Sequence, residues 1–576
     1  MITKVDKWCK KCYKLAFDSD KCPDCGSNLQ TDIPTKIYWC DACKVPILEN
    51  IIERNHICPL CNSKTKYLAS DVRPVFPEER LLIEILHDTP LKWINDSVWA
   101  CDNRYLINGH SISVKLKGFS DSDILKISSD LNKYSKYNND IAFKIHIDTF
   151  IKANSLRFNS ITSEAKDFII NESQKFRLDQ TVISFSGGKD STVTADLVIK
   201  ALRDPTVRHI FADTTLEIPY TYEYKDRYRA ANRSAIFKTA KNKDQDFLKV
   251  CEDIGPPSRV MRWCCTMFKT GPITRALNSA FRDENILTFY GIRKSESLIR
   301  SKYNRYEETS NHIKIQKQAV ASPIFFWSDF EIWLYILSED IDFNYGYRLG
   351  FDRIGCWCCP NNNDRSQFLA RIYMPEKWKI WHDYLISFAK MIGKPDPVEY
   401  IDGGWWKARQ GGNGVESSSD IKIKQTNCTT DENANIYNLN KPITEDFYSL
   451  FIPMGIVSKG LGNKVLGEVL ILDIKSNVPI ISIQPFNQSG YDYSVKIKTL
   501  NTNHKVLHRM ISYQIKKYNA CRRCLKCESI CNFNAITITS SRYYIDENKC
   551  KRCKKCVTAK YLNGGCLMTH YLRTKY

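Results

Sequence analysis

The sequence predicts an α/β protein whose core is a doubly wound, mostly parallel sheet, with small cysteine-rich domains at both ends of the chain. A short β-branched run, Thr181 to Phe185, is followed by a glycine loop and by apolar residues at helical spacing, Val193, Leu197 and Leu202. This order is typical of strand, loop and helix in a parallel sheet. Most of the 24 cysteines lie near the two ends in Cys-x2-Cys pairs, which indicates metal-binding domains.

The loop between the predicted strand and helix has the sequence Ser-Gly-Gly-Lys-Asp-Ser, from Ser186 to Ser191. Gly187 and Gly188 let the backbone turn tightly, the amides at the helix start point outward, and Lys189 adds a positive charge. The loop therefore predicts a phosphate or pyrophosphate site. It is not a Walker A loop, because the Gly-x4-Gly-Lys-Ser/Thr spacing is absent.

This loop resembles the pyrophosphate loop of the adenine nucleotide alpha-hydrolase superfamily, whose folds are doubly wound sheets. Three further segments resemble phosphoadenosine phosphosulfate (PAPS) and adenosine phosphosulfate (APS) reductases: His209 to Pro219, Tyr290 to Arg300, and Pro323 to Ile336, which includes a predicted capping box. The resemblance covers about Ile161 to Tyr400. It implies that the nucleotide is held by Ser186, Gly187, Gly188, Lys189, Asp190, Ser191, Asp213, Gly291, Arg293, Glu296 and Arg300.

The central region also contains an adjacent cysteine pair and, far along the chain, a Cys-x2-Cys pair. Adjacent cysteines seldom bridge to each other, which favours a metal over a disulfide. The pattern is similar to that of cluster-bearing APS reductases, and it implies a 4Fe-4S cluster next to the nucleotide. Its implied ligands are Cys264, Cys265, Cys356 and Cys359. Cys358 is an additional thiol that would replace Cys359 or act as a reactive neighbour, and we group it with Lys189 and Arg293 as candidate catalytic residues.

Near the C-terminal end, Cys-x2-Cys-x2-Cys-x3-Cys has the spacing of a bacterial ferredoxin, and a second Cys-x2-Cys-x2-Cys repeats its first half. Asn532 stands where a proline usually follows. We predict a ferredoxin-like α+β domain with two 4Fe-4S clusters, and zinc is the alternative for either half. The first cluster would use Cys521, Cys524, Cys527 and Cys566, and the second Cys550, Cys553, Cys556 and Cys531.

The N-terminal region contains two sets of paired Cys-x2-Cys knuckles, which predict two zinc ribbons with one zinc ion each. The first set is Cys9, Cys12, Cys22 and Cys25, and the second is Cys40, Cys43, Cys58 and Cys61. Iron is the rival metal. Ribbons either bind nucleic acid or a partner, or serve as structural caps.

The net charge of +20 is partly offset if each metal centre carries about −2. The excess is concentrated after residue 501, in a basic set that would dock an acidic, low-potential electron donor or nucleic acid, or would compensate the clusters. This basic set is Arg522, Arg523, Lys526, Lys549, Lys551, Arg552, Lys554 and Lys555. The many thiolates, the polar N-terminus and the lack of a long apolar run predict a cytoplasmic protein with no membrane segment.

The predicted domains are zinc ribbons at 1–32 and 33–70, a small α/β module of unknown role at 71–160, the reductase-like domain at 161–400, a linker and β-rich accessory region at 401–510, and the ferredoxin-like domain at 511–576. The module opens with a predicted amphipathic helix, Pro77 to Leu86, and residues 411–440 are predicted as loop. The aromatic-basic segment Trp405 to Lys407, with Arg409, would either stack a base or seal a domain edge.

Two enzymatic functions are compatible with these motifs. The first is a sulfonucleotide reductase that makes sulfite from APS or PAPS, with electrons arriving through the ferredoxin-like domain. The family's nucleophilic Glu-Cys-Gly-Leu/Ile-His segment is not found, so Cys358, Cys428 or an external thiol would replace it. The alternative is an ATP pyrophosphatase-type enzyme that adenylates tRNA or DNA for sulfur insertion. A third class is an iron-sulfur nucleotide sensor or electron-transfer subunit.

Overall fold

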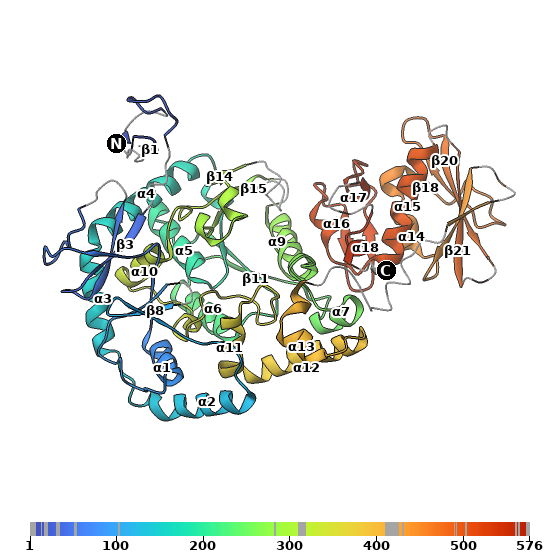
Figure 1. Cartoon of the computed structure of the whole chain (residues 1–576). Coiled ribbons are helices and arrows are strands. Elements are labelled where there is room, and N and C mark those ends of the chain that lie inside the picture. Colours follow the sequence, from blue (N-terminus) through green and yellow to red (C-terminus); the bar gives the residue numbers. More distant parts are fainter. Residues whose placement is uncertain are drawn as a thin grey trace.

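The computed structural model describes residues 7–12, 14–16, 21–29, 35–50, 55–101, 104–281, 284–308, 318–408, 425–428, 431, 433–488, 490, 492–500, 504–558, 562 and 565–571. A large body holds the N-terminal and central regions, and a second lobe holds the C-terminal region (Figure 1). None of the helices in these ranges is long and apolar enough to cross a membrane.

The central domain is built on a six-stranded sheet with the order β12-β11-β10-β13-β15-β14. All neighbouring pairs are parallel except β14 with β15. The order changes direction at β10, and ligands bind beside such a switch point in open α/β sheets. The strands are β10 (Thr181–Phe185), β11 (Arg208–Asp213), β12 (Phe237–Lys241), β13 (Ile286–Tyr290), β14 (Tyr306–Glu307) and β15 (Gln318–Ala321).

Both faces of this sheet are covered, as predicted for a doubly wound fold. Ile183 and its neighbours pack on helices α4, α5, α6 and α10, whereas Val182 packs on α9. Consecutive residues of a strand point to opposite faces, so a fully apolar strand fits this burial. The helices are α4 (Ser155–Ser173), α5 (Lys189–Leu202), α6 (Pro219–Ala231), α7 (Phe247–Ile254), α8 (Trp263–Cys265), α9 (Gly271–Phe281), α10 (Asp329–Ser338), α11 (Asp364–Tyr373), α12 (Pro375–Met391) and α13 (Pro397–Asp402).

Three small sheets precede the central domain. The hairpin of β1 (Lys7–Cys9) and β2 (Lys14–Ala16) carries Cys9 and Cys12 of the first cysteine set, and Cys22 and Cys25 follow it. The second set lies on a three-stranded sheet whose core includes Trp39 and also Phe330 and Leu334 from α10. The remaining elements are β3 (Thr35–Cys40), β4 (Val45–Asn50), β5 (Lys66–Ala69), β6 (Arg73–Pro74), α1 (Pro77–Leu86), β7 (Val98–Cys101), β8 (Arg104–Ile107), β9 (His110–Ser113), α2 (Asp121–Ser135) and α3 (Ile141–Ala153).

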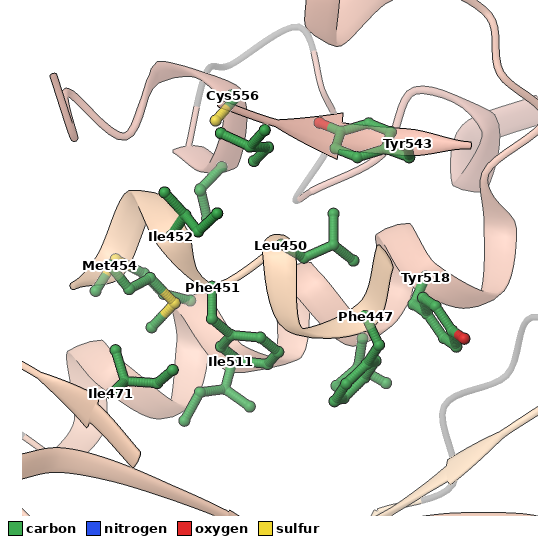
Figure 2. Packing of buried hydrophobic residues seen from close by; sticks show 14 of the residues in the cluster. Phe447, Leu450, Phe451, Ile452, Met454, Ile471, Ile511, Tyr518, Tyr543 and Cys556 are labelled. Carbon is green, nitrogen blue, oxygen red and sulfur yellow. The ribbon is translucent and has the colours of Figure 1, made fainter. Parts of the chain in front are cut away.

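The C-terminal lobe joins a six-stranded sheet of order β16-β17-β21-β20-β19-β18 to the C-terminal cysteine region. Figure 2 shows one core in which Ile471 of the sheet and Ile511 of α15 lie with Phe451, Tyr543 and Cys556. The elements are β16 (Gln425–Asn427), β17 (Ala434–Leu439), α14 (Glu445–Ser449), β18 (Ile456–Ser458), β19 (Val469–Leu472), β20 (Pro479–Phe486), β21 (Tyr493–Thr499), α15 (His504–Ala520), α16 (Lys526–Ser529), β22 (Ile536–Ile538), β23 (Tyr543–Ile545), α17 (Lys555–Thr558) and α18 (Met568–Tyr571).

The prediction of loop for 411–440 is wrong at its C-terminal end. Residues 434–439 form β17, which pairs with β21 and buries Ala434, Ile436 and Tyr437. Five of the six residues in this short run are buried, so its apolar side chains outweigh the polar composition around it. Residues 409–424, which include Arg409, lie outside the described residues.

Candidate functional site

The predicted phosphate loop connects β10 to α5 at the switch point of the sheet. Ser191 Oγ accepts a hydrogen bond from Ser186 N at 3.1 Å and donates to Gly188 O at 2.8 Å. Gly187 has a φ of +74°, and a Cβ there would lie 2.9 Å from Thr221 Cγ2. The loop thus closes on itself, and it requires glycine for its backbone conformation.

Lys189 and Arg293 form a buried charge cluster with two carboxylates. Lys189 Nζ lies 3.2 Å from Asp329 Oδ1, and Arg293 Nη2 lies 2.8 Å from the same oxygen. Arg293 Nε donates to Asp190 Oδ1 at 2.5 Å. Although burial raises it, Lys189 and Arg293 lower the pKa of Asp329 to about 2. Both cations are therefore neutralised by the protein's own carboxylates.

Asp71, from the segment before β6, completes this cluster. Its carboxylate accepts from Asp329 N at 2.8 Å and from Phe330 N at 3.0 Å, at the start of α10. Burial and the nearby Asp329 raise the pKa of Asp71 to about 7. The backbone amides at a helix start stabilise a carboxylate there, so Asp71 fixes the helix that presents Asp329. No motif in the sequence indicated this residue.

A second buried network ties the module at 71–160 to the loop. Arg73 donates to both oxygens of Glu79 at 2.7 Å, and its Nε donates to Asp352 Oδ1 at 3.1 Å. Arg365 also donates to Glu79. Lys189 Nζ donates to the carbonyl oxygen of Asp352 at 3.4 Å. The module therefore braces the site.

The other predicted nucleotide residues occupy two places. A Cβ on Gly291 would lie 2.6 Å from the backbone of Asp190, so β13 approaches the loop as closely as only glycine allows. Glu296 accepts from Arg293 N at 3.1 Å and pairs with Arg300. Asp213, at the end of β11, is engaged locally: it accepts from Thr215 N and Tyr222 OH, both at 2.9 Å.

Arg300 and Arg353 link the loop to the central thiols, because Arg300 interacts with Asp190 and Arg353, and Arg353 interacts with Cys359. Burial and the neighbouring Arg353 lower the pKa of Arg300. Burial raises the pKa of Cys359, while Arg353 and Arg262 act in the opposite direction. Arg353 and Arg262 are exposed. Like charges at such proximity favour an anionic ligand between them.

The structure brings the predicted central thiols together from two segments, and the loop after β11 packs against the second of them. The backbone around Cys356 pairs with the loop after β11, since Trp357 N donates to Leu216 O at 2.9 Å and Glu217 bridges Cys356. The Cys264 thiol interacts electrostatically with Cys265 and Cys356, and Cys359 interacts with Cys265. Thr214 Oγ1 lies 3.5 Å from Cys356 Sγ. These donors fit an iron-sulfur cluster, which needs four converging thiolates with polar neighbours.

Glu217 is a site residue that sequence reasoning missed. Its carboxyl is 9% exposed and accepts from Thr214 Oγ1 at 2.8 Å. Burial raises its pKa, although Lys269 works against this, and Cys265 adds to the rise. A buried carboxyl group thus lies beside the central thiols.

Cys358 lies in a different environment from its neighbours. Its side chain is 3% exposed in a core that includes Trp263 and Trp381. Burial, together with Cys356 and Cys251, raises the pKa of the Cys358 thiol well above its usual value. A buried protonated thiol is a poor nucleophile, which argues against the reactive role considered for Cys358.

The two C-terminal Cys-x2-Cys-x2-Cys segments adopt the same backbone. Arg523 and Leu525 in the first, and Arg552 and Lys554 in the second, have positive φ at matching positions. This curl turns amides toward sulfur: Arg523 N lies 3.4 Å from Cys521 Sγ. A pocket is lined by all four thiols predicted for the second cluster, Cys531, Cys550, Cys553 and Cys556.

The N-terminal cysteines form two compact tetrahedra. The Sγ–Sγ distances are 3.4 Å for Cys9–Cys25 and 3.9 Å for Cys12–Cys22. They are 3.5 Å for Cys40–Cys61 and 3.8 Å for Cys43–Cys58. Four thiolates around one zinc ion lie about 3.8 Å apart, so both groups could hold a metal ion. Within the described ranges these two groups alone have three or more metal-ligand atoms all within 4.8 Å; a cubane spaces its thiolates more widely, because each binds a different iron.

The C-terminal lobe docks on the helix that follows the adjacent thiols. Cys264 and Cys265 end α8, a π-helical turn spans Thr266–Thr270, and α9 begins at Gly271. Arg275 of α9 forms a two-pronged ion pair with Glu528 of α16 at 2.6 and 2.9 Å. One apolar core contains central thiols and the C-terminal Cys524 and Cys566.

Trp405 to Lys407 do not form a free stacking surface. Trp406 and Lys407 are buried, and Lys407 Nζ donates to Asn362 O at 3.0 Å, whereas Trp405 is 58% exposed. The segment therefore seals an edge of the central domain.

Residues 180–362 match the family model described as the phosphoadenosine phosphosulfate reductase domain. The chain is 33% identical over 244 residues to an uncharacterised protein of Methanocaldococcus jannaschii, covering 42% of this chain and 49% of that protein. It thus spans about half the length of that relative. It is 26% identical over 220 residues to adenosine 5'-phosphosulfate reductase of Staphylococcus epidermidis, covering 37% of this chain and 82% of that protein. The crystal structure of phosphoadenylyl-sulfate reductase from Candida auris, a phosphate complex, has 18% identity and a TM-score of 0.27, with 35% of this chain and 94% of that chain covered.

Proposed function

We propose that the protein is an iron-sulfur sulfonucleotide reductase, which converts APS or PAPS to sulfite and AMP or PAP. The observation that carries this proposal is that Arg353 interacts both with Arg300, next to Asp190 of the phosphate loop, and with Cys359, one of the predicted central ligands. A sulfonucleotide needs both a phosphate site and a second anion site, for its sulfate. The family match of residues 180–362 supports the same activity.

In this function, the loop amides and Lys189 bind the phosphates. Lys189 and Arg293 then exchange part of their pairing with Asp190 and Asp329 for pairing with the ligand. Arg300 and Arg353 hold the sulfate end toward the thiols. In the reaction an external thiol attacks the sulfur, the bond between sulfur and the bridging oxygen breaks, and AMP or PAP leaves with that oxygen. A second thiol then releases sulfite and a disulfide remains, so the dithiol gives the two electrons. Electrons passed through the clusters would reduce this disulfide again.

The clusters, when bound, supply one-electron transfer. The central group would be held by the four thiols named above, and the C-terminal groups by the two ferredoxin-like sets. The set of Cys521, Cys524, Cys527 and Cys566 lies nearer the central domain, because Cys524 and Cys566 share its core. The other set includes the exposed Cys553 and is flanked by Lys551, Arg552, Lys554 and Lys555. An acidic electron donor would dock at this outer set.

The attacking thiol is external in this proposal. Cys358 is buried, and Cys428 follows β16 in the C-terminal lobe, where its amide donates to Ala434 O. A small thiol or a partner protein's thiol would therefore supply the nucleophile.

The test is anaerobic sulfite release from APS and from PAPS, with cluster-loaded protein, a low-potential reductant and a dithiol. We expect nucleotide-dependent sulfite from the wild type, and loss of both sulfite and one cluster's iron in Cys356→Ser. The matched control, Cys428→Ser, should keep both. Loss of sulfite in Cys428→Ser with full iron would make Cys428 the nucleophile.

A second candidate is the adenylating enzyme, because the complete Ser186–Ser191 loop also suits the β,γ-phosphates of ATP. No sulfite from either sulfonucleotide, with pyrophosphate release from ATP in the presence of tRNA or DNA, would replace the reductase with this function.

A further inference from the structure

Lys517 is a buried lysine of α15 that lies between the two C-terminal cysteine sets. Its side chain is 1% exposed. The ammonium donates to the carbonyl oxygen of Cys556 and lies 5.9 Å from the centre of the Tyr543 ring. Across the described part of the chain, no carboxylate forms an ion pair with it.

A buried ammonium without a carboxylate is costly, since the loss of hydration is worth several kcal/mol. One carbonyl oxygen and one ring face do not replace the water that the charge has lost. Neutral thiols would add little to the stabilisation of the buried ammonium. The position therefore calls for a negative charge that the protein's carboxylates do not provide.

The groups around Lys517 belong to both cysteine sets. In the core around α15, Cys527 and Cys556 are buried and Cys521 packs against them. The Lys517 ammonium interacts electrostatically with four cysteine side chains, Cys527, Cys556, Cys566 and Cys521. Cys527, Cys566 and Cys521 belong to the set nearer the central domain, and Cys556 belongs to the outer set. Tyr543, which is also buried, interacts with Cys527 and Cys556. The ammonium thus lies where the two sets come together.

We propose that Lys517 is the shared counter-ion of the two C-terminal clusters and that it raises the reduction potential of both. This inference rests on the proposed iron-sulfur function of these two sets. A 4Fe-4S core with four thiolates carries about −2 when oxidised, and it gains one more negative charge when a reductant donates one electron. A fixed buried cation stabilises the reduced form more than the oxidised form, because the attraction grows with the cluster's charge.

Lys517→Gln tests this directly, since the amide can still donate to Cys556 O but carries no charge. The matched control is Lys516→Gln, its neighbour on α15, which is only partly buried. The readout is an anaerobic redox titration of the full-length, cluster-loaded protein with dithionite, followed by electron paramagnetic resonance, together with iron content.

In Lys517→Gln we expect both C-terminal potentials to become more negative by at least a tenfold change in the oxidised-to-reduced ratio, which is about 59 mV for one electron. Iron content and the potential of the central cluster should stay unchanged, and Lys516→Gln should match the wild type. Wild-type potentials in Lys517→Gln at full iron content would overturn the proposal.

Thermal unfolding before and after cluster insertion provides the second measurement. Cluster insertion should stabilise the wild type more than Lys517→Gln. If Lys517→Gln does not assemble clusters, the thermal stability of its metal-free form tests the proposal. This form should be at least as stable as the metal-free wild type, because an unpaired buried charge has been removed. A less stable metal-free variant would show a packing role and overturn the proposal.

Different results would reject the C-terminal clusters and the role of Lys517. A wild-type protein without C-terminal 4Fe-4S signals would reject the cluster assignment, and this inference with it. Clusters with unshifted potentials in Lys517→Gln would reject only the role of Lys517. Neither outcome depends on sulfite release, so both can be separated from a failure of the reductase assignment.

Discussion

Lys189 and Lys517 are both buried lysines, with exposed fractions of 4% and 1%, but they are neutralised in different ways. Lys189 lies between Asp190 and Asp329, with Arg293 sharing both carboxylates. Lys517 has thiols and a carbonyl oxygen as neighbours. The first lysine lies at the proposed nucleotide site, whose ligand would come and go, and the second at the proposed cluster site, whose cofactor would stay bound.

The group that neutralises a buried lysine differs between a substrate site and a cofactor site. A substrate site is empty for part of each cycle, so its cations need carboxylates that hold them in place when no phosphate is bound. A resident cluster is present throughout, so the protein needs no carboxylate of its own. The source of the counter-charge thus indicates whether a ligand is transient or permanent.

The largest effect should come from Asp329→Asn, which removes the carboxylate shared by Lys189 and Arg293. We expect the free energy of unfolding to fall by about 3–5 kcal/mol, because two buried cations lose a partner. ATP or APS should restore more stability in this variant than in the wild type, since the ligand replaces the lost charge. Chemical denaturation with and without nucleotide measures both, and the exposed Asp226→Asn is the control. An unchanged unfolding free energy would mean that Asp329 does not stabilise the buried charge cluster of Lys189 and Arg293.

Lys189→Met should have a smaller effect, and on ligand binding. The loss of one charge-assisted hydrogen bond to phosphate, about 1.5–3 kcal/mol, predicts a ~10–100-fold weaker nucleotide affinity in calorimetry. Iron content should not change. Lys200→Met, on the same helix and 36% exposed, should bind nucleotide normally. If Lys189→Met lost iron but kept its nucleotide affinity, the result would contradict the role proposed for Lys189 and give it the role proposed for Lys517.

A third effect concerns pH. The pKa of Asp71 is raised from 3.8 to about 7, so its contribution to stability is present below about pH 4 and is lost as the pH rises toward 7. The asparagine in Asp71→Asn does not titrate, so this variant does not lose stability in this way. Its unfolding free energy relative to the wild type should therefore increase between pH 4 and 7 and level off above 7. Denaturant titrations across this range measure the difference, with the exposed Asp121→Asn as control. Parallel curves for Asp71→Asn and the wild type would contradict the raised pKa.

Local patterns predicted the parts of the fold that depend on neighbouring residues. The strand at Thr181–Phe185, the helix at Pro77–Leu86, and the capping box of Ser328 with Glu331 are all present in the structure. Each follows from periodicity or from a short-range hydrogen bond, which a linear sequence displays.

The sites depend partly on contacts that a sequence does not display. Asp71 meets Asp329, and Arg73 meets Asp352, across long separations along the chain, and a single carboxylate or arginine carries no signal of its partner. Lys517 looks like its neighbour Lys516 in the sequence, and only packing makes one a buried charge. The cysteine sets were visible because metal chemistry fixes their spacing.

The docking of the C-terminal lobe on α9 has a consequence for how the chain can be divided. Cys524, Cys566 and Met568 are buried against the central domain, beside Trp263 and Met267. Cutting the chain before β16 would leave that apolar surface open to water, where such patches promote association. The reductase-like domain and the lobe are thus not modules that can be exchanged freely. A relative without this lobe must cover the same face of its α9 with other residues.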